Sequence, residues 1–208
     1  MRAEIINVGT ELLIGSTLNT HQQSLAKELG ELGIDLYTAV ILGDNPQRLA
    51  QALTTALFRS DLVIVTGGLG PTDDDITVRA TARTLGLDLV LDRETYGAIR
   101  RRLQARGRAM NAFQSRQAWI PEGSTAFPNP NGTAPGIWIP VTRAGKPCHV
   151  VLLPGPPREL HPMVRDPLRP TLRKLLGPAR DTLALRRLFF PGAFESDIAP
   201  RVTDWLNA

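Results

Sequence analysis

The sequence predicts an α/β fold built on a mostly parallel sheet. Short apolar runs alternate along the first half of the chain with amphipathic stretches of helical length. Strands separated by such helices form βαβ units, whose right-handed crossovers place the strands parallel in one sheet. A glycine-rich turn also follows the apolar run at 62–66 directly, where open α/β sheets bind their ligands.

The first half of the chain contains three predicted strands and three predicted helices. The apolar runs that predict strands are Glu4–Val8, Leu36–Leu42 and Leu62–Thr66. The predicted helices begin at Asn19 or Thr20, at Pro46, and near Asp74–Ile76. Gly33 and Gly86 are expected to end the first and the third, because glycine is favoured in the left-handed position that closes a helix.

The second half is less regular. Helices are predicted at Arg93–Arg108 and Met110–Ala118. Strands are predicted at Gly136–Val141 and His149–Leu153, joined by a hairpin at Arg143–Lys146. A last helix begins at Arg158, and we expect Pro162, Pro167 and Pro170 to shorten or kink it. Gly177-Pro178 predicts a boundary between a domain at 1–177 and a βα extension at 178–208. The extension has a strand-like run at Leu183–Phe190 and an amphipathic helix at Phe194–Leu206.

Composition limits the classes of function. The 208 residues are 42% hydrophobic, which is typical of a globular protein with a real core. No apolar run approaches the ~18–20 residues that span a membrane, and the N-terminus enters a strand without a secretory segment. The single cysteine, Cys148, excludes an internal disulfide framework. We therefore expect a cytoplasmic protein with no membrane partner.

The net charge is +4, and the densest cluster of arginines lies between Arg100 and Arg108. No aromatic side chains interleave with them for base stacking, so we expect a solvated helix face there rather than a nucleic-acid surface.

The stretch after the third strand indicates a phosphate site. Gly67, Gly68 and Gly70 permit close backbone approach, so that successive N–H groups can converge on an anion. No lysine follows as in a Walker A loop, and Asp73–Asp75 would repel a phosphate. Like charges ~4 Å apart cost about 4 kcal/mol at an effective dielectric of ~20, so a divalent cation is expected between them. The alternative is that the aspartates only cap the next helix.

Three other loops are candidates for the same site. After the first strand, Glu11 is a further metal ligand or general base, and Ser16 and Asn19 are possible ligand contacts. The loops at 129–136 and 154–160 follow late elements and would form the far wall of one pocket. On composition alone, all three are equally well explained as structural turns.

Together and in this order, the four loops resemble the N-terminal domain of the CinA family of competence/damage-inducible proteins. The resemblance covers about residues 3–175. Its motifs are Gly9–Leu13 with Gly15, Asn19-Thr20, Gly43–Asn45, Thr66–Thr72 with Asp74-Asp75, Asn131–Gly136, and Leu153–Pro157 with Glu159-Leu160. It implies a three-layer α/β/α sandwich of the molybdopterin-binding, MoaB/MogA-like kind. The extension resembles the start of the small domain that follows in longer relatives.

The resemblance also implies a function and a site. The expected activity is hydrolysis of ADP-ribose to AMP and ribose 5-phosphate by an ADP-ribose pyrophosphatase-type site, without a nicotinamide mononucleotide deamidase domain. The expected metal ligands are Asp74 and Asp75, which act with Glu11 in catalysis and hold Mg²⁺, or else Mn²⁺ or Co²⁺. The expected ligand-binding residues are Thr10, Ser16, Asn19, Thr66, Gly67, Gly68, Gly70, Thr72, Asn131, Gly132, Thr133, Pro154 and Gly155. His21 and Arg79 depart from the family pattern, where asparagine and an acidic residue are frequent.

Two other functions stay open. One is a module that binds molybdopterin or a related pterin phosphate without hydrolysis. The other is a degenerate regulatory or scaffold protein, in which the aspartates have no ligand. In each case the apolar face of the extension favours a homo-oligomer, either a dimer or a trimer.

Overall fold

A computed structural model describes residues 1–177, 189–192 and 194–206. Its central sheet has six strands in the order β2-β1-β3-β8-β7-β6. The strands are β1 (Arg2–Val8), β2 (Asp35–Leu42), β3 (Leu62–Thr66), β6 (Thr125–Phe127), β7 (Gly136–Arg143) and β8 (Lys146–Leu153). β1, β2, β3 and β8 run parallel, and β7 is antiparallel to both β8 and β6. The predicted α/β class with a mostly parallel sheet is confirmed.

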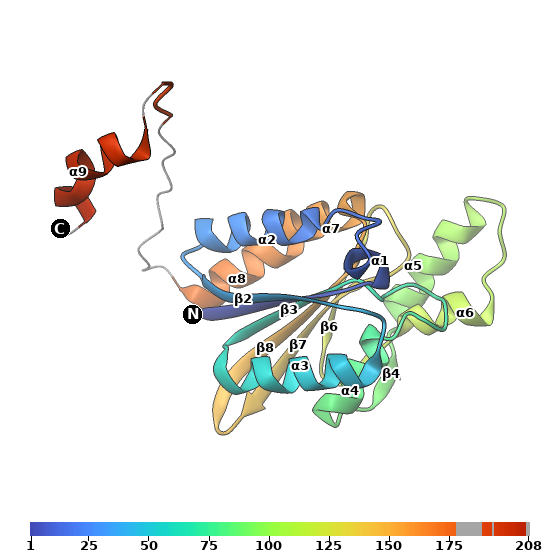
Figure 1. The fold of residues 1–208 in the computed structure, drawn as a ribbon. Helices are drawn as coiled ribbons and strands as arrows, with labels where there is room; N and C mark the ends of the chain where they lie inside the picture. The colour runs from blue at the N-terminus through green and yellow to red at the C-terminus, as the bar shows by residue number, and fades with distance from the viewer. Residues whose placement is uncertain (178–188, 193, 207–208) are drawn as a thin grey trace.

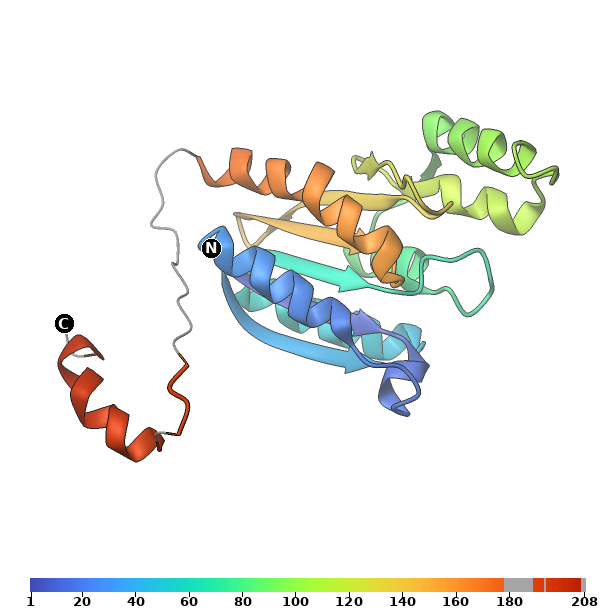
Figure 2. The same ribbon diagram turned by 90° about the horizontal axis from the view of Figure 1, so that it is seen from above.

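Helices cover both faces of this sheet, which gives the expected three layers (Figure 1). One face carries α3 (Pro46–Arg59) and α4 (Thr77–Leu85), and the other carries α2 (Thr20–Glu31), α7 (Pro157–Met163) and α8 (Arg169–Leu176). The view from above shows that α2 and the α7–α8 pair lie side by side over the strands (Figure 2). Because successive strand residues point to opposite faces, Val63 and Val65 enter one core while Leu62 and Ile64 enter the other.

Polar caps fix the predicted helix starts. Asn19 accepts a hydrogen bond from the N–H of Gln22, and Asn45 accepts one from Arg48, with Pro46 in the first turn. Gly86 adopts the left-handed conformation that closes α4. These short-range signals act within one turn of helix, which explains why the sequence locates them well.

The middle of the chain differs from the prediction. The expected helix at Met110–Ala118 is only α6 (Ala112–Ser115) followed by the 3₁₀ turn η1 (Arg116–Ala118). The helix predicted at Arg93–Arg108 ends earlier, as α5 (Arg93–Gln104). Two further strands, β4 (Leu89–Leu91) and β5 (Trp119–Pro121), form a separate antiparallel pair that the sequence did not indicate. With three residues each, they are too short to show a period of two.

Prolines and glycine shape the remaining segments as expected. After α7, residues Val164–Leu168 form a π-helical stretch before α8 begins, so the prolines interrupt the helix without ending it. The β7–β8 hairpin turns at Ala144 and Gly145, both at positive φ (48° and 75°), as tight hairpins require.

The extension is described in part. Its helix is present as α9 (Glu195–Leu206), one residue shorter than predicted at its start. Most of the strand predicted at Leu183–Phe190 lies outside the described residues. Among the residues that are described, no helix combines the length and the apolar character needed to cross a bilayer.

Candidate functional site

A polar cavity of about 450 Å³ lies at the carboxyl ends of the parallel strands. Its wall includes the loops after β1, β2, β3 and β8, and the loop that precedes β7. The order β2-β1-β3 makes this edge a switch point, because chain connections leave β1 and β3 toward opposite sides. The cavity therefore lies where the topology of an open α/β sheet leaves a crevice.

Gly67 and Gly68 set the geometry of the loop after β3. Their φ values are 87° and 64°, which residues with side chains rarely adopt. A methyl group on Gly67 would collide with the carbonyl oxygen of Val8, and one on Gly68 would collide with the Thr77 hydroxyl. The backbone of this loop thus packs directly on β1 and α4, with no room for side chains.

Asp75 organises the same loop. Its Oδ1 accepts a hydrogen bond from the N–H of Gly70 (2.7 Å), and its Oδ2 accepts from the N–H and Oγ1 of Thr72 (2.9 and 2.5 Å). These are donors that the sequence assigned to a ligand phosphate. In the part of the chain that the structure describes, the N–H groups of Gly68 and Leu69 donate to no protein acceptor. These two amides are available to bind an anion.

The loop after β1 is fastened to its neighbour. Thr10 donates from its N–H and its Oγ1 to Asp44 Oδ2 (2.9 and 2.7 Å). Ser16 donates to the carbonyl of Glu11, and Asn19 caps α2. Thr10, Ser16 and Asn19 therefore have structural contacts and lie outside the cavity wall, whereas Glu11 lines it.

The two late loops hold each other. Asn129 Nδ2 donates to Glu159 Oε2 (2.8 Å), and Asn129 Oδ1 accepts from the N–H groups of Asn131 and Gly132 (3.0 and 2.8 Å). Asn131 Nδ2 donates to the carbonyl of Arg158 (2.6 Å). This network makes the late loops one rigid wall of the cavity.

Most of the predicted site residues meet at this cavity. Those that line it are Glu11, Thr66, Gly67, Gly68, Gly70, Asp74, Asp75, Asn131, Gly132, Thr133, Pro154 and Gly155. Thr66 is 1% exposed and donates to Asn7 Oδ1 (3.0 Å), so its hydroxyl is occupied within the sheet. Thr72 lines an adjacent cavity instead.

Among the polar side chains of the wall, Arg106 and Gln117 were not predicted, and Arg158 was predicted only as part of the loop at 154–160. Arg106 and Gln117 come from the α5–η1 region, whose approach to the glycine loop is a tertiary contact without a local pattern.

The cavity is rich in negative charge. Glu11, Asp44, Asp74, Asp75 and Glu159 line it, against the guanidinium groups of Arg106 and Arg158. The nearby Thr72 side chain lowers the pKa of the exposed Asp74 carboxyl, so Asp74 is ionised at neutral pH. Within the described ranges, no three His, Cys, Asp or Glu side chains are arranged to hold a metal ion.

His21 also lines the cavity. It is 8% exposed, and its Nδ1 is buried without a hydrogen-bond partner among the described residues. Burial lowers the pKa of His21, and His161 lowers it further, against a smaller raising effect of Glu11. The ring is therefore neutral at neutral pH.

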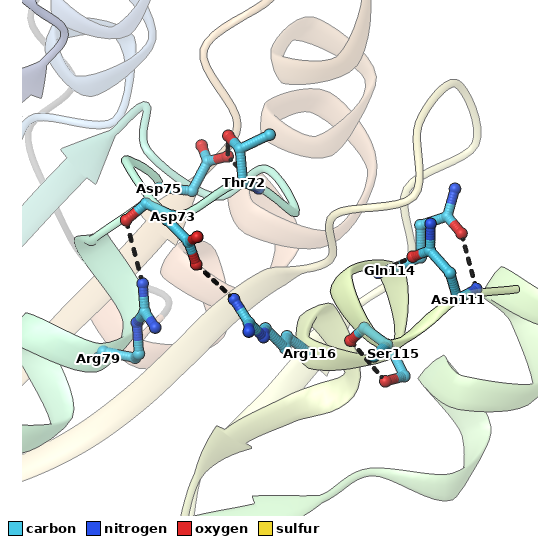
Figure 3. A network of polar contacts seen from close by, with 9 residues as sticks. Thr72, Asp73, Asp75, Arg79, Asn111, Gln114, Ser115 and Arg116 are labelled. Atoms are coloured by element: carbon cyan, nitrogen blue, oxygen red, sulfur yellow. Dashed lines mark hydrogen bonds and ion pairs between the residues drawn. The ribbon is translucent and has the colours of Figure 1, made fainter.

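Asp73 anchors the loop and is not among the residues that line the polar cavity. Its carboxylate pairs with Arg116 (2.6 Å), and its carbonyl accepts from Arg79 Nη2 (3.2 Å) (Figure 3). Arg116 also lies over the Phe113 ring, 4.7 Å from its centroid. Arg79 thus has a local contact in this protein. We name Asp73, Arg79 and Arg116 the loop clasp.

Comparison with known proteins identifies the family. The profile of a family described as "Probable molybdopterin binding domain" matches residues 4–174. This chain belongs to that family. The crystal structure of CinA from Thermoplasma acidophilum, a protein described as of unknown function, superposes with a TM-score of 0.74 at 32% identity, covering 83% of this chain and 98% of that one. The expected CinA-like, molybdopterin-binding fold is therefore confirmed.

Other relatives place the chain more finely. A CinA-like protein from Desulfovibrio desulfuricans is 46% identical over 98% of this chain and 46% of its own length. A competence-damage inducible protein from Symbiobacterium thermophilum is 45% identical over 98% of this chain and 47% of its length. The chain thus spans about half the length of the curated relatives it matches. The molybdopterin biosynthesis enzyme MoaB from Thermus thermophilus shares the fold, with a TM-score of 0.57 at 20% identity over 84% of this chain and 93% of that one.

These findings correct the expected activity. The ADP-ribose hydrolysis predicted as the main function is wrong: the matched family is a molybdopterin binding domain, and the chain is similar to CinA-like proteins. The solved MoaB structures show only that the fold is shared. The alternative prediction, a binding module, agrees better with them. The contacts of Asp75 give a physical reason, because both of its oxygens already hold the loop.

Replacing Gly67 should destabilise the protein more than replacing a glycine in open space. Gly67→Ala adds left-handed strain and a collision with the Val8 carbonyl, and we expect a loss of at least ~2 kcal/mol. Gly145→Ala is the matched control, since Gly145 has a similar φ with no atom within 4 Å, and should cost about 1 kcal/mol. Urea denaturation measures both. Equal losses would show that the contact with β1 is unimportant.

His21→Asn should reduce the acid sensitivity of folding. The pKa of His21 is lowered in the folded state. Below the ordinary pKa of an imidazole, the unfolded chain therefore binds more protons than the folded protein, and the free energy of unfolding decreases as the pH is lowered. Between about pH 8 and about pH 5, wild type should therefore lose more stability than His21→Asn. Denaturation midpoints at both values test this. His149, whose pKa burial also lowers, should cause acid sensitivity that remains in the variant.

Proposed function

We propose that this domain binds a phosphate-bearing pterin of the molybdopterin class without hydrolysing it. The observation that carries the proposal is the rigid glycine loop at the switch point of the sheet. Within the described part of the chain, its Gly68 and Leu69 amides have no protein acceptor, and Asp75 holds the rest of the loop in place. The family match, and the fold shared with molybdopterin biosynthesis proteins, name the ligand class.

A rigid loop is suited to binding. Donors that already point at an anion bind it without the cost of ordering the chain. The Asp75 contacts and the Asn129 network both act in this way, since each ties a loop of the cavity in one conformation. The carboxylates of Asp75 and Glu159, which accept these hydrogen bonds, are less available for proton transfer.

We further propose that a divalent cation, with Mg²⁺ the first choice, accompanies the ligand phosphate. The support is the excess of carboxylates around the cavity, which would otherwise repel an anion. Mg²⁺ is commonly held by one or two carboxylates together with ligand phosphates. Asp74 is the candidate protein ligand, because it is exposed and ionised. A cytoplasmic location and a homo-oligomer both stay predictions.

Calorimetry with 6-hydroxymethylpterin phosphate, a stable stand-in for molybdopterin, tests the function. We expect saturable binding in the presence of Mg²⁺ and a loss of at least about tenfold, or ~1.4 kcal/mol, when EDTA removes the cation. ADP-ribose is the comparison ligand, and should bind more weakly. Absence of binding with and without Mg²⁺ would refute the proposal.

Two neighbouring aspartates should separate the roles of loop and cation. Asp75→Asn removes an acceptor oxygen from the loop, and should cost ~1–2 kcal/mol of stability as well as ligand affinity. Asp74→Asn should leave stability unchanged but abolish the Mg²⁺ dependence of binding. Thermal melts and calorimetry measure these effects. If Asp75→Asn changed neither stability nor binding, the scaffold alternative would be correct.

A further inference from the structure

A second, mainly apolar cavity adjoins the polar one. It measures about 410 Å³, within the ~300–1,000 Å³ typical of ligand pockets. Its apolar wall consists of Leu69, Pro71, Val78, Leu89, Trp119, Pro135 and Ile137. Arg79 and Arg116 of the loop clasp also line it. The cavity lies between the glycine loop, α4 and the β4–β5 pair.

The two cavities share the glycine loop as a common wall. Gly68, Leu69, Gly70, Asp75 and Gln117 line both. One molecule can therefore place an anionic group at the free amides on one side and an apolar group on the other. The first cavity is suited to charge, and the second to a flat, weakly polar body.

Trp119 provides a surface for such a body. Its side chain is 45% exposed although it lines the cavity. Pairing of Trp119 with Leu91 fixes its backbone in the β4–β5 ladder. A heteroaromatic ring that contacts the indole would remove this apolar surface from water and gain ~0.5–1.5 kcal/mol of aromatic contact beyond the area buried.

Gln117 lines both cavities and has a buried hydrogen-bond acceptor that a ligand could satisfy. Its Nε2 donates to the carbonyl of Leu69 (3.0 Å), which fixes the orientation of the amide. Its Oε1 is buried and has no partner among the residues that the structure describes, and the whole residue is 8% exposed. A buried acceptor left unpaired costs ~1–3 kcal/mol. A ligand N–H group that donates to Gln117 Oε1 would remove this cost.

We propose that the apolar cavity binds the pterin ring of the ligand whose phosphate occupies the polar cavity. Trp119 contacts the ring face, and Gln117 Oε1 accepts a hydrogen bond from an N–H on the ring edge. Pterin presents amino and lactam N–H donors on a flat bicyclic ring, which matches both features. The inference rests on the proposed function and assigns the part of the ligand that determines specificity.

Calorimetry with wild type and three variants tests the assignment. The probes are 6-hydroxymethylpterin phosphate, inorganic phosphate and adenosine monophosphate, each with Mg²⁺. Trp119→Ala should weaken binding of the pterin phosphate at least about tenfold, and leave inorganic phosphate within about twofold. Trp119→Phe, which keeps a ring, should restore most of the affinity. Phe113→Ala is the matched control, because Phe113 is equally exposed but does not line the cavity.

The outcomes separate this inference from the proposed function. If pterin phosphate binds to wild type and Trp119→Ala binds it equally well, the ring lies elsewhere and only this inference is overturned. Tighter binding of adenosine monophosphate than of pterin phosphate would overturn the choice of heterocycle. If pterin phosphate does not bind to wild type at all, the proposed function fails and this inference with it. Retained binding of inorganic phosphate by Trp119→Ala shows that the variant is folded.

Discussion

Asn7 joins three strands just before they end, and the geometry of the site depends on this contact. The side chain is fully buried in β1. Its Nδ2 donates to the carbonyl of Val40 in β2 (3.1 Å), and its Oδ1 accepts from Thr66 in β3. A buried amide must have its hydrogen bonds satisfied, so the relative position of the three strands is restricted. One residue later on β1, the Val8 carbonyl meets Gly67, which turns the chain into the loop.

Several carboxylates of the site accept hydrogen bonds that hold its loops in place. Asp44 holds the loop after β1, Asp75 holds the glycine loop, and Glu159 binds the Asn129 amide. A charged acceptor forms stronger hydrogen bonds than a neutral one, which suits these side chains to ordering irregular backbone. The same charges make the cavity repel anions. The cation that we propose would offset this repulsion, which results from the way in which the loops are held.

The sequence predicted what depends on short-range signals. The buried run Leu62–Thr66 followed by glycines located the loop, and Asn45-Pro46 located the start of α3. It did not predict Gln117 or the β4–β5 pair, because each depends on contacts between distant segments and leaves no periodic pattern. Thr10 and Asn19 were recognised as important, but their roles in fastening a loop and capping a helix became clear only from their partners.

The error about activity has the same origin. Adjacent aspartates after a glycine loop suggest metal-assisted hydrolysis when only residue types are known, since carboxylates near a phosphate need a cation. Orientation decides between catalysis and binding. Because Asp75 uses both oxygens on the backbone and side chain of its own loop, it acts as a structural anchor. The exposed Asp74 remains able to contact a cation that arrives with the ligand. A site with a fixed cradle and one free carboxylate is better suited to holding a phosphate than to cleaving a diphosphate.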